Sequence, residues 1–217
     1  MAGQHGHGPD FSPVFRAAFA DLLHWRRDVR RFRRDSLPDG LLDEILALAD
    51  LAPSVGNSQP WRIVRVESEA RRDAVTRLFE QENNRALAAY EGEKAELYAR
   101  LKLAGLREAP VQLAVFCDPD PEQGHGLGRA TMPQTLAFSA VGMVQCLWLA
   151  ARMHGVGLGW VSIIDPQAVK TTLDVPSGWE LIGYLCLGSP EEEHLVPELE
   201  REGWQARTPL EGRIFIR

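Results

Sequence analysis

The amino-acid sequence predicts one layered domain of the α+β or α/β class. Apolar residues recur at helical spacing in some segments and as short β-branched or continuous runs in others. The predicted order is helix, helix, strand, long helical stretch, strand, helix, strand. No linker rich in Gly, Ser or Pro and no internal repeat divides the 217 residues. Because 45% of the residues are hydrophobic, the chain can bury one substantial core.

The first elements are two helices and a strand. Apolar residues recur at helical spacing from Phe15 to Trp25. A second helix is predicted to begin near Pro38 and to stop before Pro53. Residues 61–67 are rich in β-branched side chains and predict a strand.

The rest of the chain predicts a helical stretch and a buried core. Residues 69–107 are charged and rich in Ala, Leu, Glu and Arg, which predicts helices with a mobile connection. The apolar runs 111–117 and 181–187 predict buried strands. Between them, residues 133–154 predict a long helix whose polar interruptions favour a core or interface helix over a membrane span.

Charge and cysteine content exclude several classes of function. The chain has 24 Lys and Arg against 30 Asp and Glu, a net charge of −6. This balance argues against a general binder of nucleic acid or of anionic membranes. Cys117, Cys146 and Cys186 lie in apolar runs without CxxC spacing, which favours buried free thiols over a disulfide framework or a zinc site.

Residues 1–14 predict a flexible tail, because they are polar and rich in Gly. They contain no hydrophobic signal region, which predicts a cytoplasmic protein. His5 and His7 have no further ligands nearby, so we expect no metal site.

A basic cluster follows the first helix. Arg26, Arg27 and Arg30 are close enough in sequence for at least two of them to face one phosphate. A solvated basic face is the alternative. Asp28 lies among these arginines and is a candidate for acid/base chemistry, the alternative being an internal salt bridge that aligns the arginines.

The loop that precedes the first strand carries a second candidate site. Pro53, Ser54, Asn57 and Gln59 belong to the string Pro-Ser-Val-Gly-Asn-Ser-Gln-Pro-Trp. Its short polar side chains can hydrogen-bond the carbonyl and ring nitrogen atoms of a flat ligand, and its prolines stiffen the loop. A plain turn is the alternative. Together with the basic cluster, the loop predicts a phosphorylated heteroaromatic cofactor.

A third motif is the glycine run Gly155, Gly157 and Gly159. It follows a predicted helix rather than a strand, so a dinucleotide-binding fingerprint is not supported. We interpret it as a tight helix exit that brings backbone close to a planar ligand. Ser162, just beyond, has no GxSxG context, which argues against a hydrolase nucleophile.

These motifs, in this order, resemble those of the nitroreductase-like flavoproteins from about Phe15 to the C-terminus. Asp28 stands where ordinary members carry Ser or Thr. With the segment 155–162, it is similar to the BluB branch of that family, the 5,6-dimethylbenzimidazole synthases. The resemblance implies an α+β, three-layer fold with a central mixed, mainly antiparallel sheet flanked by helices, in an intertwined homodimer. It makes residues 15–217 one FMN-binding domain.

The resemblance also implies the site. Asp28 and Ser162 are expected to be catalytic, with Asp28 moving protons and Ser162 holding the flavin N5 region. Residues 80–107 are expected to form a lid, for which a solvated helical hairpin is the alternative. The residues expected to bind flavin mononucleotide (FMN) are Arg26, Arg27, Asp28, Val29, Arg30, Pro53, Ser54, Asn57, Gln59, Gly159, Trp160, Val161, Ser162 and Arg207.

The activity implied by this branch is the oxygen-dependent fragmentation of reduced FMN. The products would be D-erythrose 4-phosphate and 5,6-dimethylbenzimidazole, the lower axial ligand of cobalamin (vitamin B12). Reduced FMN would be a substrate, dioxygen a co-substrate, and an external NAD(P)H-dependent flavin reductase the source of reduced FMN. The alternatives are an NAD(P)H-dependent nitroreductase or quinone reductase with bound FMN, and a flavin-binding protein without turnover.

Overall fold

The computed structural model describes residues 9–217. Residues 1–8, which include His5, His7 and much of the expected tail, lie outside the described residues. The helices are α1 (Pro13–Trp25), α2 (Leu41–Ala49), α3 (Glu69–Ala88), α4 (Gly92–Arg100), α5 (Thr135–Met153), α6 (Pro166–Leu173) and α7 (Glu198–Arg201), with short 3-10 turns η1 (Val55–Asn57) and η2 (Glu211–Arg213). The strands are β1 (Trp61–Arg65), β2 (Val111–Cys117), β3 (Gly157–Val161) and β4 (Glu180–Gly188).

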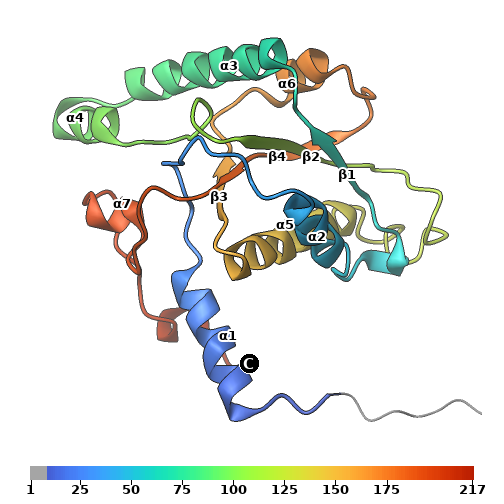
Figure 1. Ribbon diagram of the computed structural model, residues 1–217. Helices are drawn as coiled ribbons and strands as arrows, with labels where there is room; N and C mark the ends of the chain where they lie inside the picture. The colour runs from blue at the N-terminus through green and yellow to red at the C-terminus, as the bar shows by residue number, and fades with distance from the viewer. Residues whose placement is uncertain (1–8) are drawn as a thin grey trace, which may run out of the picture.

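The strands form one sheet in the order β1-β2-β4-β3, and each neighbouring pair is antiparallel. Helices α3, α4 and α6 lie on one face of the sheet, and α1, α2 and α5 lie on the other (Figure 1). The predicted three-layer α+β fold is therefore confirmed. Within residues 9–217, the one parallel contact of the sheet is the isolated bridge between Asp28 and Leu158.

The two central strands contribute to a separate core on each face. Along β2, Leu113 and Val115 pack in the cluster with α2 and α5, whereas Ala114 and Phe116 pack in the cluster with α3 and α6. This alternation follows from the two-residue period of a strand. Both faces are covered, which explains why β2 reads as a continuous apolar run rather than an alternating one.

Helix α5 is the core helix that its composition predicted. By length and composition alone it could cross a membrane. It packs instead against α2, β2 and β3, and Ala140, Met143 and Leu147 are fully buried. Phe138 and Met153, on its other side, remain more than half exposed.

Strand β3 and helices α6 and α7 were not predicted. The sequence of β3 is Gly-Leu-Gly-Trp-Val, and glycine is unfavourable in strands, so the pattern was interpreted only as a helix exit. Helix α6 does carry a start signal. Asp165 accepts hydrogen bonds from the backbone N–H groups of Gln167 and Ala168, and Pro166 occupies the first turn.

The three cysteines are free, as predicted. Burial raises the pKa of the Cys117 thiol to about 11 and that of the Cys186 thiol to about 12. Both thiols therefore stay protonated at neutral pH, which makes them poor nucleophiles.

Candidate active site

The segment that carries the basic cluster runs along the open edge of the sheet. Immediately after α1, the Val29 N–H donates to the Leu158 carbonyl at 3.0 Å, and the Arg33 N–H donates to the Ser189 carbonyl at 2.8 Å. These bonds hold residues 28–33 beside β3 and the end of β4. The backbone of the cluster is thus fixed by the sheet, and its side chains have defined directions.

The three glycines of the Gly155–Gly159 run have two different tasks. Gly155, at φ +73°, ends α5, and the Val156 N–H returns to the Ala151 carbonyl at 2.9 Å, as in a Schellman cap. This confirms the predicted tight helix exit. A Cβ at Gly157 would lie 2.8 Å from the Val29 side chain, and a Cβ at Gly159 would overlap the Val29 carbonyl oxygen. The close backbone approach that these two glycines permit in this structure is therefore to Val29.

Asp28 connects the basic cluster to β3. Its Oδ1 accepts the backbone N–H of Trp160 at 2.9 Å, and its Oδ2 accepts Nε of Arg30 at 2.8 Å. The internal salt bridge, which was the alternative to an acid/base role, is thus present. The Asp28 side chain nevertheless keeps 31% of its surface exposed, so the carboxylate is oriented and accessible at once.

The other predicted residues of this region gather around Asp28. Val29, Arg30, Gly159, Trp160 and Val161 pack around it together with residues 103–105 and Cys186, and they leave no room for a water molecule between them. Ser162 is exposed directly after the end of β3, two positions beyond the Trp160 amide that Asp28 accepts. The two predicted catalytic residues therefore belong to the same end of the sheet edge.

Arg26, Arg27 and Arg207 bring three positive charges together. Burial lowers the pKa of Arg26, Arg207 lowers it further, and Asp28 partly opposes this. Burial also lowers the pKa of Arg27, with Arg26 and Arg207 as further causes. Within residues 9–217, none of the three guanidiniums forms an ion pair with a carboxylate. Guanidinium groups bind phosphate through paired hydrogen bonds, so this group of arginines is suited to an anionic ligand.

Trp148 of α5 organises this group, and no sequence pattern distinguishes it within its apolar helix. Its ring lies under the Arg26 guanidinium at 4.9 Å, and its Nε1 donates to the Arg27 carbonyl at 3.1 Å. The ring also packs against Trp160 at 6.3 Å between centroids. One indole therefore positions two arginines of the cluster relative to β3.

Arg30 and Arg31 are engaged differently. Besides Asp28, Arg30 donates to the Lys102 carbonyl at 3.0 Å. Arg31 pairs with Glu198 at 2.6 Å, and this hydrogen bond raises the pKa of the Arg31 guanidinium. Among the residues that the structure describes, Arg26 and Arg27 thus have no carboxylate partner, whereas Arg30 and Arg31 each pair with one.

The loop that contains Pro53, Ser54, Asn57 and Gln59 is held by hydrogen bonds of its own. The Gln59 N–H donates to Ser54 Oγ at 3.0 Å, and the Gln59 side chain reaches Asp50 at 3.3 Å. Asn57 and Gln59 have φ values of 53° and 41°, a left-handed region that Asn tolerates better than most residues. These bonds are compatible with the predicted stiff loop, and its ligand remains a prediction.

The structure does not bring this loop next to the basic cluster within one chain. The loop is attached to α5 at Ser139, whose Oγ accepts the Val55 N–H, and the cluster is attached at Trp148. Nine residues of helix amount to about 13 Å and two and a half turns, so the two attachments lie on opposite sides of α5. Figure 1 shows η1 and the segment after α1 at opposite ends of the molecule.

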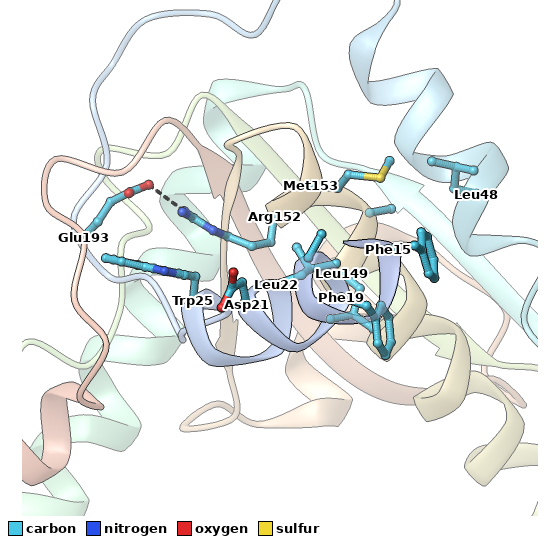
Figure 2. Close-up of a pocket in the computed structure, with 12 residues that line it drawn as sticks. Phe15, Phe19, Asp21, Leu22, Trp25, Leu48, Leu149, Arg152, Met153 and Glu193 are labelled. Atoms are coloured by element: carbon cyan, nitrogen blue, oxygen red, sulfur yellow. Dashed lines mark hydrogen bonds and ion pairs between the residues drawn. The ribbon is translucent and has the colours of Figure 1, made fainter. Parts of the chain in front are cut away.

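A separate apolar pocket contains none of the predicted FMN-binding residues. Its volume is about 630 Å³, and it lies between α1 and α5 (Figure 2). Phe15, Phe19 and Trp25 of α1 face Leu149 of α5 across it, and the Arg152–Glu193 ion pair of 2.5 Å closes one side. No group of three or more His, Cys, Asp or Glu residues within positions 9–217 is arranged to hold a metal ion.

Comparisons with known proteins agree on one family. Residues 23–189 match the model of the nitroreductase family. The chain is 56% identical to the 5,6-dimethylbenzimidazole synthase of Rhodospirillum rubrum, over 93% of this chain and 96% of that protein. It is 48% identical to the protein of the same name from Rhodobacter capsulatus, over 93% of this chain and 98% of that one. Among solved structures, iodotyrosine deiodinase bound to FMN and 3-iodo-L-tyrosine has a TM-score of 0.68 at 28% identity, over 81% of this chain and 91% of that one.

Proposed function

The chain belongs to the nitroreductase family, and within it we propose that it is a 5,6-dimethylbenzimidazole synthase. The reaction is the oxygen-dependent fragmentation of reduced FMN to 5,6-dimethylbenzimidazole and D-erythrose 4-phosphate, which supplies the lower axial ligand of cobalamin. The observation that carries the proposal is the Asp28 carboxylate, held on the Trp160 amide beside an unpaired group of arginines. The similarity to two synthases over nearly their whole length supports it.

The described residues fit a phosphorylated flavin. A phosphate would supply the counter-charge that Arg26, Arg27 and Arg207 lack, and it would place the ribityl chain toward Asp28. The FMN-bound solved structure of similar fold supports this choice of ligand. Reduced FMN supplies the chemistry with dioxygen, whereas the protein supplies binding, orientation and proton transfer.

Asp28 is the proposed acid/base group. The Trp160 amide and Arg30 fix the two oxygens of its carboxylate, so the group faces a bound ligand in one direction. From there it accepts and returns protons at ribityl and ring atoms. Ser162, exposed after β3, donates a hydrogen bond to the N5 region. The backbone from Gly159 to Ser162 lines the reactive edge of the ring.

A homodimer completes the site in this proposal. Because the loop 53–59 and the basic cluster lie on opposite sides of α5, each flavin would meet the cluster of one protomer and the loop of the other. The apolar surface of α1 supports such an assembly, since Phe15 and Phe19 are 49% and 44% exposed. Exposed apolar surface of this kind marks interaction sites in soluble proteins.

An external NAD(P)H-dependent flavin reductase is the proposed source of reduced FMN, and the cytoplasm is the proposed location. Free cysteines fit a reducing compartment. With protein, oxidised FMN and NAD(P)H, product is expected only after a flavin reductase is added. Product formed without the reductase would contradict the need for such a partner.

The proposed function is tested by mixing the purified protein with chemically reduced FMN in air. After quenching, chromatography and mass spectrometry are expected to show 5,6-dimethylbenzimidazole and an equivalent loss of flavin. An NAD(P)H-dependent nitroreductase or quinone reductase would instead oxidise NAD(P)H with those acceptors and return the flavin intact. A flavin-binding protein without turnover would do neither, so full recovery of oxidised FMN would overturn the proposal.

A further inference from the structure

An aromatic cluster joins the helix α4 to the C-terminal segment. Trp204 contacts Tyr90 edge-on, with ring centroids 5.5 Å apart, and Tyr98 at 5.9 Å. The two tyrosines, one just before α4 and one within it, are 5.1 Å apart. Lys94 Nζ lies 5.7 Å from the Tyr90 ring and 5.8 Å from the Trp204 ring. Aromatic and cation–π contacts of this kind depend on geometry, so they fix α4 relative to residue 204.

Helix α4 has few other anchors at this end. Tyr98 is the buried residue of the helix, and its hydroxyl donates to Asn83 Oδ1 of α3 at 2.9 Å. The half-buried Trp204 ring therefore packs on the buried aromatic ring of α4. Figure 1 shows α4 above α7, at the end of the molecule where the segment after α1 passes.

The same short segment enters the group of arginines. Arg207 follows Trp204 by three residues, a stretch that spans at most about 10 Å, and its charge acts on Arg26 and Arg27. One end of this segment therefore contacts α4, and the other end belongs to the anion site. The segment begins at a fixed point, because the Trp204 N–H donates to the Leu199 carbonyl at 2.8 Å.

The basic cluster binds the residues that precede this segment in the chain. Arg31 pairs with Glu198 of α7 at 2.6 Å, and Arg27 Nε donates to the Leu195 carbonyl at 2.8 Å. Residues 195–199 are thus bound whether or not an anion is present. Residues 204 and 205 are held through their backbone N–H groups, which donate to the Leu199 carbonyl, whereas Arg207 acts as a like charge on Arg26 and Arg27.

We propose that Trp204 is a positioning residue that couples phosphate binding to the lid. Phosphate bound by Arg26, Arg27 and Arg207 removes the repulsion at Arg207, which stabilises residues 204–207 and strengthens the hold of Trp204 on α4 over the flavin. The inference rests on the proposed function in one respect, that the phosphate is that of FMN. In this proposal the phosphate contributes both to the binding of FMN and to the closure of the lid.

Hydrogen exchange in residues 90–107 tests this coupling without any turnover. In the wild type, oxidised FMN is expected to slow exchange there by about tenfold or more, and riboflavin, which lacks the phosphate, by much less. Trp204→Leu is expected to abolish the slowing by FMN, and Trp204→Phe, which keeps an aromatic ring, to restore part of it. Gln205→Ala is the matched control, because that side chain bonds only to the neighbouring Ala206 carbonyl.

The outcomes separate this inference from the proposed function. Equal slowing by FMN and riboflavin, or undiminished slowing by FMN in Trp204→Leu, would overturn the coupling. Flavin titration shows whether Trp204→Leu still binds FMN, and circular dichroism shows whether it folds. If Trp204→Leu failed to fold, the comparison of FMN with riboflavin on the wild type would still decide. If FMN slows exchange in the wild type far more than riboflavin does, but no 5,6-dimethylbenzimidazole is formed, only the proposed function is refuted.

Discussion

The carboxylate of Asp28 accepts the backbone N–H of Trp160 at 2.9 Å, although the two residues are 132 positions apart in sequence. Trp160 lies in β3, an edge strand, so its outward N–H has no strand partner. Asp28 satisfies this donor and pairs with Arg30 through its other oxygen. A single carboxylate therefore sets the position of the basic cluster relative to the sheet.

Asp28→Asn is expected to separate catalysis from binding. General acid/base catalysis contributes about 100-fold or more, so formation of 5,6-dimethylbenzimidazole is expected to fall by at least that factor. FMN affinity is expected to be equal or higher, because the lost negative charge opposed the phosphate. Single-turnover assays and flavin titration measure the two quantities. Asp35→Asn, on an exposed side chain of the same segment, is the control. Normal turnover in Asp28→Asn would exclude a catalytic role.

Arg207→Ala is expected to weaken FMN binding selectively. Hydrogen bonds to charged groups contribute about 1.5–3 kcal/mol, which corresponds to roughly a 10- to 100-fold rise in the Kd for FMN. Riboflavin affinity should not change, because the lost contact is with the phosphate. Calorimetric titration of both flavins measures this, with the exposed Arg33→Ala as control. An equal loss for both flavins would place Arg207 elsewhere than at the phosphate.

Substitutions of Trp148 are expected to weaken FMN binding by graded amounts, because Trp148 positions Arg26 and Arg27. Trp148→Phe removes the hydrogen bond to the Arg27 carbonyl, at a cost of about 1 kcal/mol, and keeps a ring under Arg26. Trp148→Leu also removes the ring. The Kd for FMN is therefore expected to rise in Trp148→Phe and further in Trp148→Leu, with thermal unfolding as the check on stability. Identical Kd values in both variants would show that the ring under Arg26 does not contribute to FMN binding.

Gly159→Ala is expected to destabilise the protein because the new methyl group would overlap the Val29 carbonyl. Overpacking of this kind costs about 1–3 kcal/mol in the free energy of unfolding. It would also displace Asp28, the residue before Val29, and so lower turnover. Gly178→Ala is the control, since a Cβ there meets no heavy atom within 4 Å. Unchanged stability in Gly159→Ala would mean that residues 28–29 are not held as described.

Two inactive variants are expected to restore activity to each other if the site is shared between protomers. Arg26→Ala with Arg207→Ala disables the cluster, and Ser54→Ala with Asn57→Ala disables the loop. A statistically mixed dimer population would hold about a quarter of its sites intact. The activity of co-refolded mixtures measures this fraction. No recovery, despite heterodimers detected by native mass spectrometry, would place cluster and loop in one chain's site.

Strands and helices that bury continuous apolar surface were predictable from the sequence. Strands β2 and β4 and helix α5 are of this kind, because burial on most sides leaves an unbroken apolar run. Strand β3 was not predictable, since Gly157 and Gly159 remove the usual strand signal. Glycine is required at both positions because Val29 packs against them, a contact made only in the folded chain.

The candidate site was only partly predictable from the sequence. The cluster 26–31 and the loop 53–59 are local in sequence, so their residue types pointed to an anion and a flat ring. Arg207 was identified only through the family resemblance, because its segment has no periodicity. Trp148 was hidden by its apolar surroundings, and its contacts with Arg26 and Arg27 join positions more than a hundred residues apart.

The position of residues 28–33 along β3 also protects the protein from self-association. An uncovered edge strand offers a row of free N–H and C=O groups to which a strand of another chain can add. Asp28 and Val29 occupy those groups at Leu158 and Trp160. Substitutions on this segment can therefore change its side chains, but they must leave its backbone in place. A displaced backbone would open the sheet edge to aggregation.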